Sequence, residues 1–293
     1  NLLPGKACIN DVSFGEGAVF IERWYELEKL IYEYSKINIE IYAQRNDANP
    51  ATGSFKDLAA ANVAATLKKN NIKNYVAAST GNISVAFSRY LAAAGINFTA
   101  VLPFNSTSAQ EAEIKSFGQN VIKVDGYYDE AKKHAYRYAK NYKQLLAAGT
   151  EDPLRIEAKK TMCFEWFRQL GKIPNKYFQA LSGGTGALGI TKGLQELNQA
   201  ELINDQSFTS LMLVQTDKCA PMANSWKSAK SHNFFTGWQY NYSINDNPET
   251  DIPTLSTGNP TSYPRVAEAV KETNGEILTF NEESAPLVAR WAA

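Results

Sequence analysis

The sequence predicts an α/β protein with doubly wound, largely parallel sheets, divided into two domains. From about residue 39 onward, short β-rich runs alternate with longer alanine-rich runs, the pattern of a parallel sheet covered by helices on both faces. The length of 293 residues exceeds the ~100–200 residues of a usual domain. No apolar run approaches the ~20 residues that a membrane helix needs, so we expect the hydrophobic segments to lie in globular cores.

The strands and helices are expected to alternate in chain order. Gly95, Gly118 and Gly171 follow three of the helical runs, where glycine commonly closes the last turn. The stretch 241–260, rich in Asn and Pro, lacks periodicity and is expected to form a long surface connection, which in such folds is often functional. The predicted strands are residues 39–43, 75–78, 98–102, 121–124, 177–181, 211–215 and 276–280. The predicted helices are residues 57–69, 85–94, 109–117, 129–141, 155–170, 188–197 and 264–273.

The composition excludes several classes of partner. Thirty acidic and thirty basic residues give no net field to attract nucleic acid or an anionic membrane. Cys8, Cys163 and Cys219 have neither zinc-site spacing nor the even number of a disulfide framework. His134 and His232 lack a metal-ligand or triad partner nearby in sequence. We therefore expect a cytoplasmic protein without a metal site, and the first residues lack the regions of a signal peptide.

Residues 51–57 (ATGSFKD) form the first of three loops that could carry chemistry, because ligands of open α/β sheets bind in loops that follow a strand and open a helix. Lys56 is expected in the first turn of a helix whose interior is almost all small or apolar. A cation there opposes the helix dipole by roughly 0.3–1 kcal/mol. This position suits a lysine that forms an imine with a carbonyl cofactor or is held neutral in a dry pocket. The alternative is a solvated lysine beside Asp57.

The other two loops are suited to anions. Residues 79–82 (STGN) follow a predicted strand and offer hydroxyls, an amide and backbone N–H groups to a carboxylate, although the same residue types cap helices without any ligand. Residues 182–186 (SGGTG) follow the predicted strand 177–181, and successive glycines let backbone N–H groups converge on a phosphate.

The glycine-rich loop leaves a dinucleotide-binding alternative open. Gly184, Gly186 and Gly189 fit the pattern GxGxxG, and Asp217 lies near the end of the next strand. Such a fingerprint normally opens the first βα unit, however, and it would leave Lys56 and residues 79–82 without a role. A nucleotide-triphosphate P-loop is excluded because no Lys-Ser or Lys-Thr pair follows the glycines.

Taken together, these segments resemble the fold type II pyridoxal-phosphate enzymes, which have the tryptophan synthase β-like architecture, and the threonine synthase family most closely. The resemblance covers nearly the whole chain and implies pyridoxal 5'-phosphate as cofactor, a role in amino-acid metabolism and a homodimer. The matching segments, in the family's order, are residues 15–17 (GEG), 49–57 (NPATGSFKD), 78–82 (ASTGN), 152–161 (DPLRIEAKKT), 182–186 (SGGTG) and 258–260 (GNP).

The resemblance implies roles for individual residues. Lys56 would be the Schiff-base lysine and the proton carrier at the substrate α-carbon. Asn82 would bind the ring hydroxyl of the cofactor, and Phe55 is expected beside Lys56 at the cofactor. The phosphate loop would consist of Ser182, Gly183, Gly184, Thr185 and Gly186. The residues expected at the substrate are Ser79, Thr80, Gly81, Asn82 and Ile83, around its carboxylate, and Arg155, which would bind its own phosphate group.

Departures from the family pattern bear on the reaction. Ile83 stands where threonine synthases have a threonine tied to reaction specificity, and Gly149 and Ala187 stand where they have asparagines that bind the substrate phosphate. Losing polar groups that a transition state needs usually costs orders of magnitude in rate. We therefore favour the reaction of the related cysteate synthases, which replace the phosphate of O-phosphoserine with sulfite. Threonine synthesis from O-phosphohomoserine and water is the alternative.

A non-catalytic binding protein of this fold is a third possibility. The family continues beyond the segment that matches residues 284–293 into a motif whose Ser or Thr contacts the pyridine nitrogen, and the given sequence stops before it. For the domains, we expect residues 46–150 to form a smaller one with Lys56 and residues 79–82. Residues 1–45 and 151–293 are expected to form a larger one with the glycine-rich loop. The sequence leaves open the phospho-amino acid, the nucleophile and any allosteric effector.

Overall fold

The computed structural model describes residues 3–79, 81–126, 128–203, 209–246 and 248–292, and its chain divides into two compact units. Unit 1 consists of residues 1–17, 47–162 and 184–196, and unit 2 consists of residues 18–46, 163–183 and 197–293. Unit 1 thus includes segments outside the predicted domain 46–150, and the division into two functional domains stays a prediction. No helix in the described part of the chain is long and apolar enough to cross a membrane.

Unit 1 is built on a parallel sheet with strand order β5-β4-β3-β6. Its strands are β3 (Asn74–Ala78), β4 (Asn97–Leu102), β5 (Asn120–Lys123) and β6 (Leu145–Leu146). The first three agree with the predicted strands to within one residue at each end. The two-residue β6 was not predicted, because so short a run has no periodicity to recognise.

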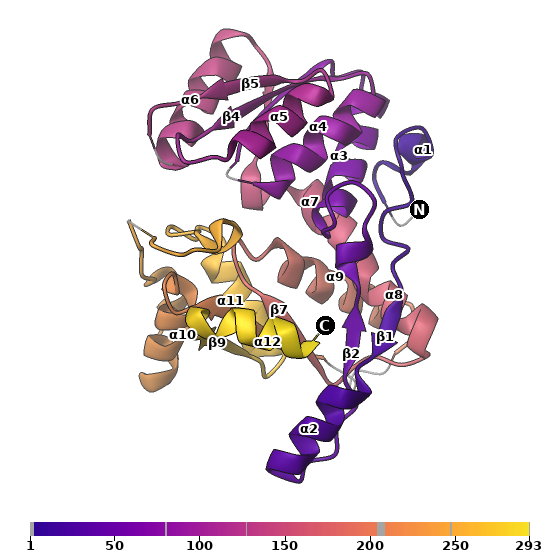
Figure 1. Cartoon of the computed structure of the whole chain (residues 1–293), viewed down its shortest axis with the longest axis vertical. Coiled ribbons are helices and arrows are strands. Elements are labelled where there is room, and N and C mark those ends of the chain that lie inside the picture. Colours follow the sequence, from indigo (N-terminus) through magenta and orange to yellow (C-terminus); the bar gives the residue numbers. More distant parts are fainter. Residues whose placement is uncertain (1–2, 80, 127, 204–208, 247, 293) are drawn as a thin grey trace. The chain divides into compact units, whose positions relative to one another are not determined.

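Helices cover both faces of this sheet, as predicted for a doubly wound fold (Figure 1). Successive strand residues point to opposite faces. Tyr75 and Ala77 therefore pack into the core that α3 and α4 form, whereas Val76 packs with Ala131 and Ala135 of α6. The helices of unit 1 are α1 (Lys6–Ile9), α3 (Lys56–Lys69), α4 (Asn82–Ala93), α5 (Ser108–Ser116), α6 (Tyr128–Asn141) and α7 (Pro153–Lys159), with a 3-10 turn at Gly149–Glu151 and another at Asn46–Ala48, which spans the unit boundary.

One predicted helix is wrong in its extent. Residues 155–170 form two helices, α7 and α8 (Thr161–Leu170), separated at Lys160. Asp152 caps α7 by accepting a hydrogen bond from Leu154 N at 2.9 Å, and Pro153 occupies the first turn. At the break, Thr161 Oγ1 donates to the Ala158 carbonyl at 2.8 Å. These capping residues set the start of α7 two positions before the predicted one.

Three helices of unit 1 approach one another closely because small residues line them. In α3, Asn62 donates from Nδ2 to Leu154 O of α7 at 2.9 Å. Helix α9 (Thr185–Gln199), which begins in unit 1 and ends in unit 2, meets α7 at Gly189. A Cβ at Gly189 would lie 2.7 Å from the Lys159 Cβ, so only glycine allows α7 and α9 to come this close. The packing places Lys56, Arg155 and Lys159 within one compact unit.

Unit 2 contains a parallel sheet of order β7-β8-β9 and a separate antiparallel pair, β1-β2. The predicted strand 39–43 is wrong in place: the strand begins at Tyr42, and it pairs with β1 and not with a parallel sheet. Leu211, Leu213 and Ile277 of the parallel sheet are buried, as are Trp226 of α10 and Val266 of α11. The elements of unit 2 are β1 (Ile21–Arg23), α2 (Tyr25–Ser35), β2 (Tyr42–Gln44), β7 (Lys176–Ala180), β8 (Ser210–Thr216), α10 (Pro221–Ser231), α11 (Tyr263–Glu272), β9 (Glu276–Phe280) and α12 (Ala285–Ala292), with 3-10 turns at Trp238–Tyr240, Pro253–Leu255 and Glu282–Ser284, and with most of α8.

The predicted glycine stops are confirmed. Gly95, Gly118 and Gly171 follow α4, α5 and α8 with φ of +69°, +71° and +65°, the left-handed region that favours glycine. Helices α2, α10 and α12 were not predicted: α2 and α10 mix polar and aromatic residues without an alanine-rich run, and α12 is only eight residues long.

Candidate active site

Lys56 is the first residue of α3, and Asp57 fixes the loop before it. The buried Asp57 carboxylate accepts hydrogen bonds from Ala51 N at 2.7 Å, from Thr52 N at 3.1 Å and from Thr52 Oγ1 at 2.6 Å. Asp57 is therefore occupied by its own loop and forms no ion pair with Lys56, whose Nζ instead lies 4.0 Å from the centroid of the Phe55 ring.

The electrostatic surroundings make the charged form of the Lys56 amine less favourable than in an ordinary lysine. Burial, and after it the positive charge of Arg155, lowers the pKa of Lys56 from 10.5 to about 8. With that pKa about a tenth of the amine is unprotonated at pH 7, far more than for an ordinary lysine, and this is the form that attacks a carbonyl or accepts a proton. The geometry thus fits the predicted reactive lysine better than the solvated alternative.

Arg155 and Lys159 lie one turn apart on α7, and therefore on the same face of that helix. Arg155 is 9% exposed; its Nη1 donates to the Gly149 carbonyl at 2.5 Å, and its Nε has no hydrogen-bond partner. Lys159 is fully buried, and its Nζ donates to the Thr185 hydroxyl and lies 4.7 Å from the centroid of the Phe55 ring. Among the described residues, no carboxylate forms an ion pair with Lys56, Arg155 or Lys159.

The loop 79–82 joins β3 to α4 in the same unit. Ser79 is buried, its backbone N–H donates to Val101 O at 3.1 Å, and its Oγ accepts from Gly81 N at 3.1 Å. Asn82 is the first residue of α4, and Ile83 packs against the apolar core of unit 1. Thr80, also predicted to bind substrate, lies outside the described residues.

The glycine-rich loop runs from unit 2 into unit 1. In unit 2, the Ser182 and Thr257 hydroxyls are 2.8 Å apart, and Ser262 Oγ donates to Gly183 O at 2.7 Å, so this part of the loop adjoins the 258–260 motif. In unit 1, Gly184 has φ +77°, and α9 begins at Thr185 and includes Gly186. The predicted position of the loop at a helix N-terminus is confirmed.

Sequence reasoning missed Lys159. It lies within the quoted segment 152–161, but nothing there distinguishes it from its neighbour Lys160. In the structure Lys160 pairs with Glu157 at 2.6 Å and with Glu196 at 2.8 Å, whereas Lys159 contacts, within the described part of the chain, only the Thr185 hydroxyl and the Phe55 ring in this way. The one available signal was the spacing of four residues between Arg155 and Lys159.

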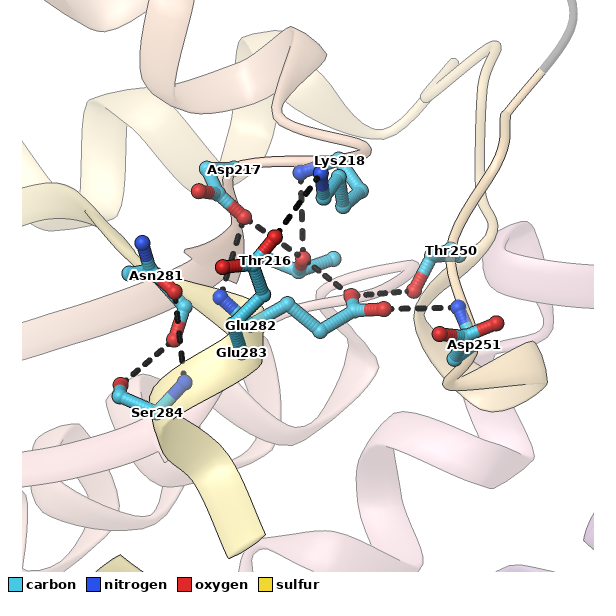
Figure 2. Close-up of polar contacts among 9 residues, drawn as sticks. All are labelled: Thr216, Asp217, Lys218, Thr250, Asp251, Asn281, Glu282, Glu283 and Ser284. Atoms are coloured by element: carbon cyan, nitrogen blue, oxygen red, sulfur yellow. Dashed lines mark hydrogen bonds and ion pairs between the residues drawn. The ribbon is translucent and has the colours of Figure 1, made fainter. Parts of the chain in front are cut away.

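Unit 2 holds a polar cluster around the buried carboxylate of Glu282, which was not predicted either (Figure 2). Glu282 accepts hydrogen bonds from the Thr216 hydroxyl, from Thr250 Oγ1 at 2.6 Å and from Asp251 N at 2.7 Å. Its own N–H donates to Asp217 Oδ1 at 3.1 Å. The cluster therefore ties the connection 241–260 to the carboxyl ends of β8 and β9. Asp217, which the dinucleotide-binding alternative placed at a ribose, instead accepts the hydrogen bond from Glu282 N after β9.

Comparison with known proteins places the chain in a family. Residues 22–293 match the family model described as "Pyridoxal-phosphate dependent enzyme". The chain is similar to a threonine synthase of Methanocaldococcus jannaschii, 28% identical over 98% of this chain and 68% of that protein. It is also similar to a threonine synthase of Bacillus sp. strain ULM1, 25% identical over 96% of this chain and 72% of that protein.

Solved structures support the fold independently of sequence. The structure of maize serine racemase superposes with a TM-score of 0.75 over 96% of this chain and 78% of that one, at 14% identity. At so low an identity the likeness concerns the fold alone. The predicted α/β architecture of the fold type II pyridoxal-phosphate enzymes is thereby confirmed.

We predict that Lys56 titrates far below an ordinary lysine. In the cofactor-free protein, its acylation by acetic anhydride, followed residue by residue by mass spectrometry, should rise with pH around a midpoint of about 8. Arg155→Met should move this midpoint toward 10.5, because it removes the nearby positive charge. A midpoint that stays near 10.5 in the unaltered protein would contradict the buried setting of the amine.

We predict that Glu282 makes unit 2 sensitive to acid. Hydrogen bonds from Thr216 and Thr250 lower the pKa of Glu282 below 4.5. Its contribution to stability is therefore complete above the unfolded-state pKa and is lost as pH falls through the lower folded-state pKa. Glu282→Gln should lower the urea midpoint at neutral pH and flatten its decline below about pH 4.5.

The matched control is Glu283→Gln, since the Glu283 side chain is 80% exposed and lies 3.9 Å from Lys218 in its ion pair. It should leave the urea midpoint nearly unchanged at all pH values. Identical pH profiles for Glu282→Gln and the unaltered protein would show that the carboxylate charge has no part in holding this turn.

Proposed function

The chain belongs to the family of pyridoxal-phosphate-dependent enzymes, and we propose on that basis that it replaces the phosphate group of an O-phospho amino acid. Its cofactor is pyridoxal 5'-phosphate. We propose O-phosphoserine and sulfite as the substrates, with cysteate and phosphate as products. The C–O bond to phosphate breaks, the C–S bond to sulfite forms, and phosphate leaves with the bonding electrons, so no oxidant or reductant is required.

The observation that carries this proposal is the cationic group of unit 1. Lys56, Arg155 and Lys159 are packed together around Phe55 and α7, and Asp152 is the carboxylate whose charge acts on Arg155 and Lys159. Buried cations without ion pairs are costly unless an anion joins them. The residues present therefore fit an aldehyde cofactor that carries a phosphate together with a substrate that carries another.

When bound, the cofactor supplies a sink for the electrons of the substrate α-carbon. We assign to Lys56 the attachment of the cofactor and the transfer of the α-proton, which its Nζ can accept because its pKa is lowered to about 8. We assign the substrate carboxylate to Ser79, Thr80, Gly81, Asn82 and Ile83, the ring hydroxyl to Asn82, and the cofactor phosphate to the loop Ser182, Gly183, Gly184, Thr185 and Gly186.

We assign the phosphate of the substrate to Arg155. Its guanidinium is already held at one end by the Gly149 carbonyl, and its buried Nε still has a hydrogen to donate. A guanidinium presents several donors in one plane, which suits the oxygens of a phosphate. An arginine fixed in advance also loses little side-chain entropy when the ligand binds.

Three positions at which this chain departs from the threonine synthase pattern support the shorter substrate. Gly149 offers Arg155 only its backbone carbonyl, Ala187 is fully buried, and Ile83 packs against the apolar core, so none of the three positions carries a polar side chain. The threonine synthases have polar residues at the matching positions. The similarity to proteins named threonine synthase supports the second candidate, the conversion of O-phosphohomoserine and water to threonine.

We predict that the reconstituted enzyme releases phosphate from O-phosphoserine when sulfite is present and forms cysteate, as followed by a phosphate assay and by mass spectrometry of the products. Lys56→Ala should release none above the uncatalysed rate, since it lacks the amine that moves the α-proton. Release only from O-phosphohomoserine, with threonine formed, would overturn the choice of substrate. No release from either compound would overturn the proposed reaction.

We predict that Arg155→Ala raises KM for the phosphorylated substrate by about 10–100-fold, the size expected for hydrogen bonds to a charged group, with a smaller effect on kcat. Arg168→Ala is the matched control, because the Arg168 side chain is 64% exposed and pairs with Glu165 on its own helix. Equal kinetics in the two variants would remove Arg155 from the site.

A further inference from the structure

We propose that Lys159 is a cationic ligand of the cofactor phosphate, acting from α7 beside the Thr185 hydroxyl at the start of α9. The proposed function counts Lys159 in the cationic group of unit 1 but assigns it no ligand. The inference rests on the cofactor and not on which phospho-amino acid is the substrate.

Helices α7 and α9 bring Lys159 to the phosphate loop. Thr185 and Gly189 are four residues apart and so lie on the same face of α9, the face that meets α7. A Cβ at Gly189 would lie 2.7 Å from the Lys159 Cβ and 2.9 Å from its carbonyl carbon. The Lys159 Cβ and backbone are thus held against Gly189, and its Nζ extends one turn toward the N-terminus of α9, to the Thr185 hydroxyl.

Thr185 connects this amine to the place where a phosphate would bind. Its oxygen accepts the hydrogen bond from Lys159, which leaves its own O–H free to donate to an anion. The first N–H groups of a helix also lack carbonyl partners, and the helix dipole favours negative charge there. A buried lysine directed at this helix start adds a full charge to those partial charges.

The position of Lys159 is unfavourable unless an anion is bound. It is fully buried, and among the described residues its amine has one hydrogen bond, to the Thr185 hydroxyl, and one cation–π contact, with the Phe55 ring. Burial, followed by the charges of Lys56 and Arg155, lowers the pKa of Lys159 well below 10.5. A doubly charged phosphate beside the amine would oppose all three effects.

The neighbouring lysines differ in this respect. Lys160 pairs with Glu157 and Glu196, and Lys192, on α9, pairs with Glu157. The side chain of Lys192 is also 42% exposed. Lys192→Met is therefore a control on the same pair of helices that removes a positive charge away from the phosphate loop.

The test compares pyridoxal 5'-phosphate with pyridoxal, which lacks the phosphate. Dissociation constants are measured by absorbance titration of the cofactor-free protein and of its Lys159→Met, Lys159→Arg and Lys192→Met variants. Lys159→Met should weaken the binding of pyridoxal 5'-phosphate by about 10–100-fold and leave the binding of pyridoxal within about threefold. Lys159→Arg should restore much of the loss, and Lys192→Met should change neither constant.

Calorimetry of the unaltered protein provides a second measurement, which needs no variant to fold. Binding of pyridoxal 5'-phosphate near pH 8, repeated in buffers of different ionisation enthalpy, should take up more protons than binding of pyridoxal, because the phosphate favours protonated Lys159. Equal weakening of both ligands by Lys159→Met, or equal proton uptake for both, would overturn the role of Lys159 alone. An unaltered protein that bound neither ligand would overturn the proposed reaction as well.

Discussion

The burial of positive charge without ion pairs among the described residues is the constraint that explains the arrangement of unit 1. Lys56, Arg155 and Lys159 share one region without an ion pair among the described residues, and Asp152 supplies the opposing charge. A folded protein can tolerate such a group in two ways, by losing protons or by binding anions. Lys56 and Lys159 have lowered pKa values, and Arg155 keeps an unpartnered Nε. Both responses prepare the same region for a phosphorylated ligand.

The scaffold holds these side chains in place with groups that do no chemistry themselves. Asp57 closes the loop before Lys56, Asn62 joins α3 to α7, and Gly189 lets α9 approach α7. Helix α3, which begins at Lys56, has ten buried residues and so fixes this lysine in the core of unit 1. Hydrophobic packing of the helices is therefore what offsets the cost of gathering like charges, and a bound anion would return part of that cost as affinity.

Sequence patterns predicted the structure correctly where it depends on residues that are close in sequence. The strands of the unit 1 sheet, the glycines after α4, α5 and α8, and the placement of Lys56 at a helix start could all be read from the sequence. The predicted helix over residues 155–170 was wrong because the apolar pattern continues through Lys160 while the backbone does not. The strand predicted at residues 39–43 was misplaced because the true strand, β2, has only three residues and pairs antiparallel with the equally short β1, so neither is long enough to show a pattern.

The sequence by itself determined the chemistry that is possible: a lysine at the start of an apolar helix, a polar loop after a strand and a glycine-rich loop before another helix. Tertiary structure alone decided which charges meet. Lys159 and Lys160 are adjacent and identical, yet one faces α9 and Thr185 while the other meets Glu157 and Glu196. Glu282 and Glu283 are likewise adjacent, and only Glu282 is buried among hydroxyls. The physical reason is that burial and pairing depend on the direction of a side chain relative to elements distant in sequence, and residue order alone does not record that direction.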